Sequence, residues 1–188
     1  EACLVGSEMC IRDRPISDTS PEIWMLGTSN YGSQLAAYLG IPYCYAYFIT
    51  EGQGISESIK NYKENFKPSK FLNKPKVNVC LWALASDDDE KAEYLFSSRA
   101  YWKIARNYGE LDTLKSPKDA LSKLNENNWM SEFKNMISSS IVGSSETVKN
   151  KINSIKDDND FDELTILTWC HDEKERINSY KIFSELIN

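Results

Sequence analysis

The segment from Pro21 to Phe48 restricts the folds open to this chain more than any other. Its residues predict a strand, a polar turn, a helix and a second strand, which together form one βαβ unit. Gly40 is placed to end the helix, and Pro42 prevents its continuation. The second strand is apolar on both sides of its alternation, as in a strand that is covered on both faces. The four parts are Ile23–Leu26, Gly27–Ser33, Gln34–Leu39 and Tyr43–Phe48.

Strands and helices continue to alternate along the rest of the chain. Nearly continuous apolar runs predict strands at Val77–Ala85 and Glu163–Trp169. Helical spacing of apolar residues and capping signals predict the helices between and after them. The helices cover Ile55–Phe66, Glu90–Asn107, Lys118–Asn125, Trp129–Ile137 and two segments that begin after Ser144 and Asp172. The last helix is predicted to bury Ile177, Tyr180, Phe183 and Ile187.

This alternation predicts an α/β fold in which parallel strands carry helices on the outside. About four strands are too few to close a barrel, because a TIM (β/α)₈ barrel needs eight strands and typically about 250 residues. The polar region Tyr108–Asn128 and the short helices beside it read as a helical insertion. The chain is therefore predicted to form half of a TIM barrel.

Charge and cysteine content narrow the class of partner and the compartment. Acidic residues number 28 against 22 basic ones, which gives a net charge of −6 and argues against nucleic acid or an anionic membrane as partner. No apolar run is long enough to span a bilayer. Cys44, Cys80 and Cys170 lie in or beside apolar runs without CxxC spacing, as expected for reduced thiols in a cytoplasmic protein.

A run of acidic residues from Asp87 to Glu90 invites a metal interpretation. It lacks the spaced oxygen ligands and the glycine of a calcium loop, whereas negative charge is favourable at the start of a helix. We therefore interpret the run as the N-terminus of the Glu90–Asn107 helix and predict no metal site.

The first fourteen residues do not form a recognisable fold element. Leu4 to Arg14 (LVGSEMCIRDR) matches the in-frame translation of a transposase adapter used in sequencing libraries, so residues 1–14 are interpreted as a non-native tail. A signal peptide is disfavoured because acidic residues interrupt any apolar core. Residues 15–188 then form one partial barrel domain, and the natural protein is expected to begin further upstream, with this chain as its C-terminal piece.

A series of segments, in the correct order, resembles the luciferase-like flavin monooxygenases. The first resembles the fifth barrel strand, its Gly-Ser-Ser turn and the following helix of that family, and it reads WMLGTSNYGSQLAAYLGIPYCYAYF. The later segments are YKENFKPSKFLNKPKVNV, SDDDEKAEYL, IVGSSETVKNKI and DELTILTWCHDEKERINSY. The resemblance covers residues 21–188 and implies the C-terminal half of such a barrel.

The resemblance implies a flavin enzyme in which reduced FMN and O₂ oxidise a small organic substrate. NAD(P)H would be supplied directly or through a partner flavin reductase, and the parent protein would be a homodimer. Backbone amides at a helix N-terminus and nearby hydroxyls bind a phosphate dianion without a lysine. The turn therefore supplies Thr28, Ser29, Gly32 and Ser33 as the predicted FMN-binding residues, with simple helix capping as the alternative.

Four aromatic residues are candidates for a pocket that holds the flavin ring or the substrate. Tyr45 and Tyr47 alternate with their neighbours on the predicted strand, and which set faces the barrel interior stays open. Trp82 and Trp169 lie on other strands and are placed to line the same cavity, with core packing as the alternative. No catalytic residue is identified, because the family's active-site residues on strands one to four have no counterpart here, and His171 reads as structural.

Three other functions remain open at this point. One is a non-catalytic flavin-binding relative of luciferase, and another is a deazaflavin-dependent reductase of the same superfamily. The third is an α/β scaffold without a ligand. The sequence does not identify the substrate, and the fragment alone is expected to have little activity.

Overall fold

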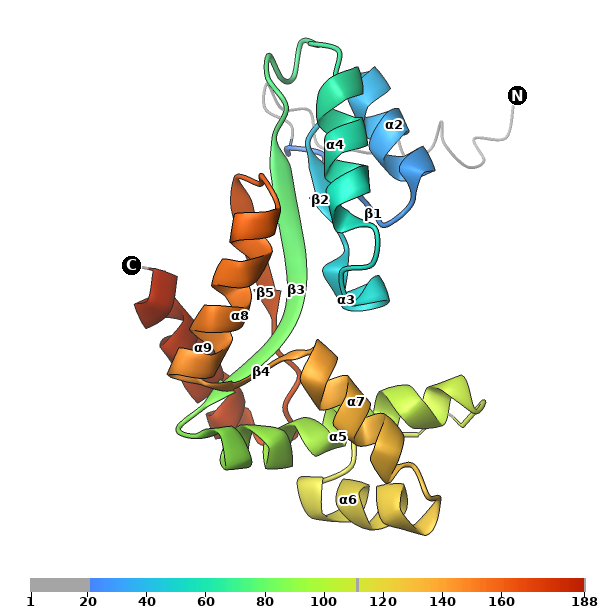
Figure 1. Ribbon diagram of the computed structural model, residues 1–188, viewed down its shortest axis with the longest axis vertical. Coiled ribbons are helices and arrows are strands. Elements are labelled where there is room, and N and C mark those ends of the chain that lie inside the picture. The colour runs from blue at the N-terminus through green and yellow to red at the C-terminus, as the bar shows by residue number, and fades with distance from the viewer. Residues whose placement is uncertain (1–20, 111, 188) are drawn as a thin grey trace, which may run out of the picture.

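The computed structural model describes residues 21–110 and 112–187, and the predicted adapter-derived tail, residues 1–14, lies outside them. The described chain forms a parallel sheet with helices packed along it (Figure 1). The strands are β1 (Met25–Gly27), β2 (Tyr43–Tyr45), β3 (Val77–Ser86), β4 (Ile141–Ser144) and β5 (Glu163–Leu167). The helices are α2 (Asn30–Leu39), α3 (Tyr47–Thr50), α4 (Ile55–Asn65), α5 (Asp89–Asn107), α6 (Pro117–Glu126), α7 (Met130–Ser139), α8 (Ser145–Asp158) and α9 (Glu173–Ile187).

The long strand β3 connects the other strands of the sheet. Its first residues pair with β2, Asn78–Trp82 pair with β5, and Ala83–Ser86 pair with β4. β1 pairs with β2, and every pairing is parallel. Leu81 is fully buried and Leu84 is 1% exposed, on opposite faces of the strand. The continuous apolar sequence of β3 is explained by burial on both faces.

The predicted α/β class and parallel strands are confirmed, and the structure adds one strand that the sequence did not predict. β4 has only four residues, and two of them are Gly143 and Ser144, which weaken any strand signal. It forms because its backbone pairs with the end of β3. Local sequence carries little information about a strand that depends on such a long-range partner.

The predicted strand Tyr43–Phe48 is too long. β2 ends at Tyr45, and the next residues form the short helix α3. The Tyr45 hydroxyl lies 2.8 Å from Thr50 Oγ1 and donates to the Gln53 carbonyl at 2.6 Å, which draws the following segment back over the strand. The prediction failed because the alternation of apolar residues carries no information about the contact of Tyr45 with Thr50 and Gln53.

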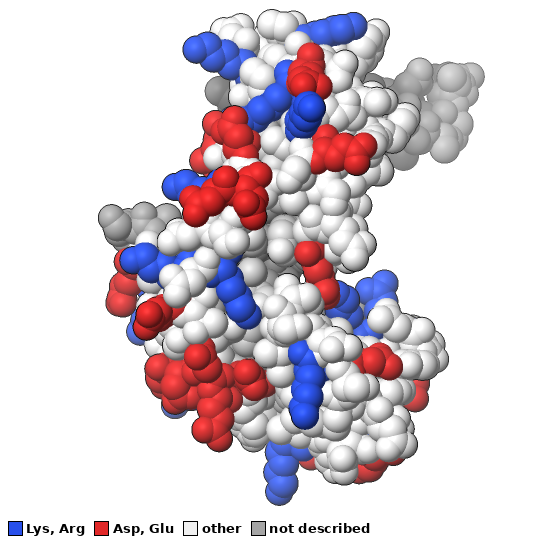
Figure 2. Space-filling view, in the orientation of Figure 1, with Lys and Arg blue, Asp and Glu red and all other residues white. Residues whose placement is uncertain are grey.

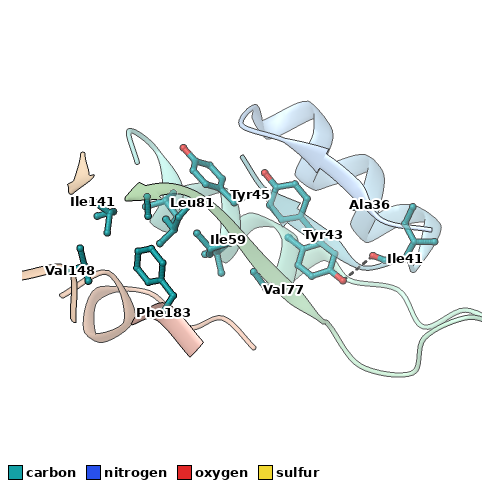
Figure 3. Packing of buried hydrophobic residues seen from close by; sticks show 14 of the residues in the cluster. Ala36, Ile41, Tyr43, Tyr45, Ile59, Val77, Leu81, Ile141, Val148 and Phe183 are labelled. Atoms are coloured by element: carbon teal, nitrogen blue, oxygen red, sulfur yellow. Dashed lines mark hydrogen bonds between the residues drawn. The ribbon is translucent and has the colours of Figure 1, made fainter. Parts of the chain in front are cut away.

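One apolar core lies between the sheet and helices α2, α4, α8 and α9 (Figure 3). Alternate residues of β3 point into it, among them Val77 and Leu81, which are fully buried. Val148 of α8 and Phe183 of α9 pack near Leu81 and Ile141. These helices cover one face of the sheet, as helices cover the outside of a parallel barrel.

A second core joins the end of β3 to helices α5, α6 and α7, which lie between β3 and β4 and which we call the helical insertion from here on. Trp82 and Leu84, on the other face of β3, pack with buried residues of α5, α6 and α7. The Phe96 ring of α5 lies 5.0 Å from the Trp82 ring and 6.2 Å from the Phe133 ring of α7, measured between centroids. The insertion therefore packs across the C-terminal end of β3 (Figure 1).

The acidic run begins helix α5, as the sequence predicted. Asp88 is the N-cap, and its carboxylate accepts a hydrogen bond from the Lys91 amide at 2.7 Å. The Asp89 carboxylate also accepts from the Ser144 amide at 2.6 Å and from Thr147 Oγ1 at 3.1 Å. This single carboxylate connects the first turn of α5 to the first turn of α8.

The predicted apolar stripe of the last helix is correct only in part. Phe183 is 2% exposed, whereas Ile177 is 48% and Tyr180 is 41% exposed, and the side chain of Ile187 lies outside the described part of the structure. Ser179 occupies a buried position instead, and its hydroxyl accepts a hydrogen bond from the Ala85 amide at 3.0 Å. The buried face of α9 therefore contains Ser179 and Phe183, and it does not follow the spacing of the apolar residues.

Truncating Phe183 is expected to destabilise the fold far more than truncating Ile177. Phe183→Ala leaves a cavity in a well-packed core and should lower the free energy of unfolding by about 3–5 kcal/mol. The half-exposed Ile177→Ala should change it by only about 0.5 kcal/mol. Urea unfolding followed by circular dichroism measures both values, and equal effects would contradict the packing described for α9.

Candidate functional site

The sheet has a second face that the helices of the first core do not cover. Because Val79 and Leu81 point toward those helices, Cys80 and Trp82 lie on the opposite face. On this face the apolar side chain of Leu26 is 54% exposed and that of Leu167 is 37% exposed. In a barrel this face lines the interior, where ligands bind at the carboxyl ends of the strands.

The turn between β1 and α2 is a rigid, capped helix start. Ser29 is the N-cap of α2, and its hydroxyl accepts a hydrogen bond from the Gly32 amide at 3.3 Å. The amides of Asn30 and Tyr31 have no partner inside the helix, as in the first turn of any α-helix. The Thr28 hydroxyl forms no hydrogen bond with the described part of the chain. This turn therefore presents donors at the carboxyl end of β1 that no described residue accepts from.

The predicted turn residues differ in how accessible they are. Ser33 is fully buried, and its hydroxyl donates to the Asn30 carbonyl at 3.0 Å while it accepts from Asn61 Nδ2 at 3.2 Å. Ser29 is exposed, and a methyl group added at Gly32 would meet only Ser29 Oγ, at 3.8 Å. Ser29, Gly32 and Thr28 thus lie where a ligand can reach them, and Ser33 stabilises the turn from inside.

Two side chains from neighbouring elements fix the backbone of this turn. The Tyr43 hydroxyl donates to the Gly27 carbonyl at 3.0 Å, and the Ser58 hydroxyl donates to the Thr28 carbonyl at 3.4 Å. Burial raises the pKa of Tyr43 to about 12, so it is a neutral hydrogen-bond donor at physiological pH. The turn keeps its conformation without using the Thr28 hydroxyl.

A cavity of about 440 Å³ lies beyond the carboxyl ends of β2 and β5, and we call it the Trp82 cavity. Its apolar walls are aromatic or aliphatic side chains that come from α3, β3, α5 and the end of β5. The Trp102 ring meets the Trp169 ring edge to face, with centroids 5.0 Å apart. The apolar lining residues are Phe48, Ile49, Trp82, Trp102, Leu167 and Trp169.

Three cations of α5 line the same cavity, and their environments differ. Lys103 forms an ion pair with Glu51 at 2.8 Å, and Arg106 is exposed beside the Trp102 ring. Arg99 is 8% exposed and lies over the Trp82 ring, 3.7 Å from its centroid. Burial lowers the pKa of the Arg99 guanidinium to about 10, so Arg99 is cationic at neutral pH.

Glu51 lies next to Arg99 and Lys103, outside the lining of this cavity, and both of its oxygens are occupied. One accepts from Lys103 Nζ at 2.8 Å and the other accepts from Ser139 Oγ at 2.7 Å. Burial alone would raise the pKa of Glu51, but these two hydrogen bonds and the nearby charges of Lys103 and Arg99 lower it below its usual value. Glu51 is therefore anionic at neutral pH and neutralises Lys103.

The structure brings two of the four predicted pocket residues together and separates the other two from them. Trp82 and Trp169 line one cavity, and their contact with a flavin ring or a substrate stays a prediction. Tyr45 is fully buried in the first core on the helix-covered face, and Cys44 lies on the open face instead. Tyr47 begins α3 rather than lying on a strand, and its side chain packs partly against the same core.

Sequence reasoning missed Arg99, although the sequence holds a signal for it. Arg99 follows Phe96 by three positions and precedes Ala100, so a cation interrupts the buried stripe of α5. A charged residue within an apolar stripe is seldom placed there by packing alone. The sequence does not show that Arg99 lies over Trp82, because this contact depends on the fold.

Charges of both signs lie on the face of the molecule that Figure 2 shows. On the face shown in Figure 2, lysines and arginines are interspersed with aspartates and glutamates. Lys91, for example, pairs with both Asp87 and Glu175, and Lys76 pairs with Glu163. Among the described residues no helix is long and apolar enough to cross a membrane.

A parallel sheet with outer helices and a cavity at the carboxyl ends of its strands is the arrangement of a (β/α)₈ barrel. The fold and the site thus define part of a barrel of the enzyme type. The model of the luciferase-like monooxygenase family matches residues 4–158, a range that includes the segment interpreted above as adapter-derived. The chain belongs to the luciferase-like monooxygenase family, whose members are generally enzymes.

Relatives and solved structures agree with this assignment. A luciferase-like monooxygenase from Escherichia coli (strain K12) is 32% identical over 162 residues, which are 85% of this chain and 48% of that protein. The crystal structure of apo-MsnO8 superposes with a TM-score of 0.80 at 22% identity and covers 92% of this chain and 52% of its own. The chain spans about half the length of the curated relatives it matches.

More distant structures of the same fold hold different cofactors. The oxygenating constituent of 3,6-diketocamphane monooxygenase from Pseudomonas putida, in complex with FMN, has a TM-score of 0.55 at 18% identity over 89% of this chain and 48% of its own. An F420-dependent secondary alcohol dehydrogenase has a TM-score of 0.57 at 13% identity over 91% of this chain and 50% of its own. The fold therefore accommodates FMN in one protein and F420 in another.

Alkaline pH should weaken the structure through Tyr43. Its pKa is raised from 10.0 to about 12 in the folded protein, so between these values only the unfolded chain loses this proton. The stability contributed by neutral Tyr43 is complete below pH 10 and is lost as the pH rises through 12. In urea unfolding, the excess stability of the wild type over Tyr43→Phe should therefore be smaller at pH 11 than at pH 9.

Tyr31→Phe is the control for this measurement, since Tyr31 is 73% exposed. Its stability difference from the wild type should not change between the two pH values. An unchanged difference for Tyr43→Phe as well would refute the assignment of a buried, neutral Tyr43 that supports the turn.

Proposed function

We propose that this chain is part of an FMN-dependent monooxygenase that uses reduced flavin and O₂ to oxidise a small organic substrate. The observation that carries the proposal is the β1–α2 turn, a capped helix start with unpaired donors at the carboxyl end of a barrel strand. Family membership supports the reaction class, and the FMN complex of a monooxygenase of the same fold supports the cofactor.

The residues of the turn fit a phosphate group. The backbone amides of Asn30 and Tyr31 lie at the positive end of the α2 dipole, where an anion is favoured. The Thr28 hydroxyl is a further donor without a partner among residues 21–110 and 112–187, and Ser29 is exposed beside it. The open space at Gly32 lets a phosphate approach the backbone closely. Thr28, Ser29 and Gly32 would hold the phosphate directly, and Ser33 would hold the turn in shape.

The remaining parts of the proposed site have separate tasks. When bound, reduced FMN supplies the electrons with which O₂ is activated for substrate oxidation. The aromatic walls of the Trp82 cavity exclude water from an organic substrate and orient it. NAD(P)H would reduce the flavin either directly or through a partner flavin reductase. The whole protein would be a cytoplasmic homodimer. We assign no catalytic acid or base to this chain.

A deazaflavin-dependent reductase is the second candidate, because an F420-dependent dehydrogenase has the same fold. It differs from the first proposal in its cofactor and in needing no O₂. Equilibrium binding of FMN and F420, followed by a comparison of substrate turnover with and without O₂, separates the two. Flavin binding without turnover would instead identify a non-catalytic relative.

Substitution of Gly32 by alanine is expected to weaken FMN binding about tenfold or more without loss of stability. The added methyl group meets no protein atom closer than 3.8 Å, so the fold accepts it, whereas a bound phosphate would collide with it. Ser29→Ala and Thr28→Val should weaken binding by a smaller factor, since each removes one hydrogen bond. Fluorescence titration with FMN measures these changes.

Gln34→Ala, on the exposed surface of the same helix, is the matched control and should leave FMN affinity unchanged. The titrations are made on the 188-residue chain and on the longest genomic reading frame that contains it. If Gly32→Ala and Ser29→Ala bind FMN as tightly as the wild type in both proteins, the proposed phosphate site is wrong.

The genomic reading frame also tests the proposed origin of residues 1–14. We expect the natural coding sequence to differ from LVGSEMCIRDR directly upstream of Pro15. Sequencing the source DNA by amplification without library adapters decides this. Recovery of the same eleven codons would show that the segment is native.

A further inference from the structure

Arg99 is a buried cation with no hydrogen-bond or ion-pair partner in the described part of the chain. Its side chain is 8% exposed, and its guanidinium lies over the Trp82 ring at 3.7 Å from the centroid. Within residues 21–110 and 112–187 it forms no hydrogen bond and no ion pair. Buried cations in proteins are normally paired, because removing a charge from water without a counter-ion is costly. The ring contact offsets part of this cost, and the N–H donors of the guanidinium remain unused.

No carboxylate of the described residues neutralises the guanidinium of Arg99. Glu51 is the carboxylate that acts on it, but the two oxygens of Glu51 are taken by Lys103 and Ser139. Lys103 is neutralised by the same contact. Arg106 lies at the exposed side of the cavity. A ligand with a carboxylate would therefore neutralise the buried charge of Arg99, and Arg106 would remain as a second cation at the exposed side of the cavity.

The walls beside Arg99 suit a flat apolar body. Trp102 and Trp169 meet edge to face on the side of β5, and Phe48 closes the side of α3. The Trp82 indole N–H is buried and has no acceptor in the described chain, so a second donor lies unsatisfied next to the guanidinium. A volume of about 440 Å³ falls within the range of small-molecule pockets.

We propose that the Trp82 cavity binds an organic carboxylate with an aromatic or similarly flat body. The carboxylate accepts hydrogen bonds from the Arg99 guanidinium, which matches its two oxygens in geometry. The tryptophan rings cover the body of the molecule. The inference that this carboxylate is the oxidised substrate rests on the proposed monooxygenase function. The inference that the cavity binds it requires no flavin.

The test uses the 188-residue chain with phenylacetate as the probe and the neutral phenylacetamide as its matched analogue. Binding is followed through the indole N–H signals in ¹H–¹⁵N spectra, with the Trp82 signal assigned from Trp82→Phe. Phenylacetate should bind at least about tenfold more tightly than phenylacetamide, as expected for a hydrogen-bonded charge pair. It should shift the Trp82 signal.

Three variants make the result specific. Arg99→Met keeps the length of the side chain and should remove the preference for the acid over the amide. Arg99→Lys keeps the charge without the fork of donors and should retain part of the preference. Arg176→Met removes an exposed arginine of α9 and should leave the affinity for phenylacetate unchanged. Far-ultraviolet circular dichroism and thermal unfolding verify that each variant is folded.

Two outcomes would overturn the proposal. The first is equal binding of phenylacetate and phenylacetamide by the wild-type chain, a measurement that does not depend on any variant. The second is displacement of phenylacetate by inorganic phosphate together with loss of FMN affinity in Arg99→Met, which would assign the cavity to the FMN phosphate. If the chain binds phenylacetate through Arg99 but neither the chain nor the longest genomic reading frame that contains it binds FMN, the carboxylate site stands and the proposed flavin function fails.

Discussion

The structure depends on the pairing of β3 with three other strands. Through backbone hydrogen bonds, β2 and β5 pair with overlapping parts of Val77–Trp82, β4 pairs with Ala83–Ser86, and each neighbour takes its register from β3. Burial of both faces makes these hydrogen bonds costly to break, because their groups would lose partners away from water. Leu81 and Trp82 are adjacent in the sequence but lie on opposite faces of β3, and each packs in a different core. The helix layer and the insertion are therefore positioned by the same strand.

The two cores also separate two tasks within the chain. The core around Leu81 supports the β1–α2 turn, because Tyr43 is buried in that core and its hydroxyl donates a hydrogen bond to the Gly27 carbonyl. The core around Trp82 supports the cavity and the buried Arg99. The proposed phosphate contacts and the proposed carboxylate contact thus rest on different packing. Their energies should be nearly independent, because they share no side chain.

Much of the fold was readable from the sequence because its signals are local. The apolar run of β3, the caps at Asp88 and Ser144, and the spacing of Ile55 and Ile59 all predict the elements that form. The errors arise where a distant contact decides the conformation. β4 exists because β3 offers it a partner, and the strand after Tyr43 ends early because Tyr45 reaches Thr50 and Gln53. The burial of Ser179 on α9 depends in the same way on the Ala85 amide.

The candidate site was predicted less completely, for a related reason. The turn residues could be named because a helix start and its donors are contiguous in sequence. Trp82 and Trp169 could be named as strand aromatics, but their shared cavity is a property of the fold. Arg99 carried a charge at a buried helical position, yet nothing local showed whether a carboxylate would pair with it. Its unpaired state follows from Glu51 being used by Lys103 and Ser139, contacts that span 52 and 88 residues of sequence.

The insertion leaves the sheet and returns to it at neighbouring points. Ser86, the last residue of β3, pairs with Ser144, the last residue of β4, and Asp89 joins the starts of α5 and α8 at the same place. A segment whose two ends are held together in this way can change its length or sequence with little effect on the strands. Arg99 lies on this segment, while the β1–α2 turn does not. Related chains can therefore change the wall of the Trp82 cavity and still keep the part of the fold that carries the turn.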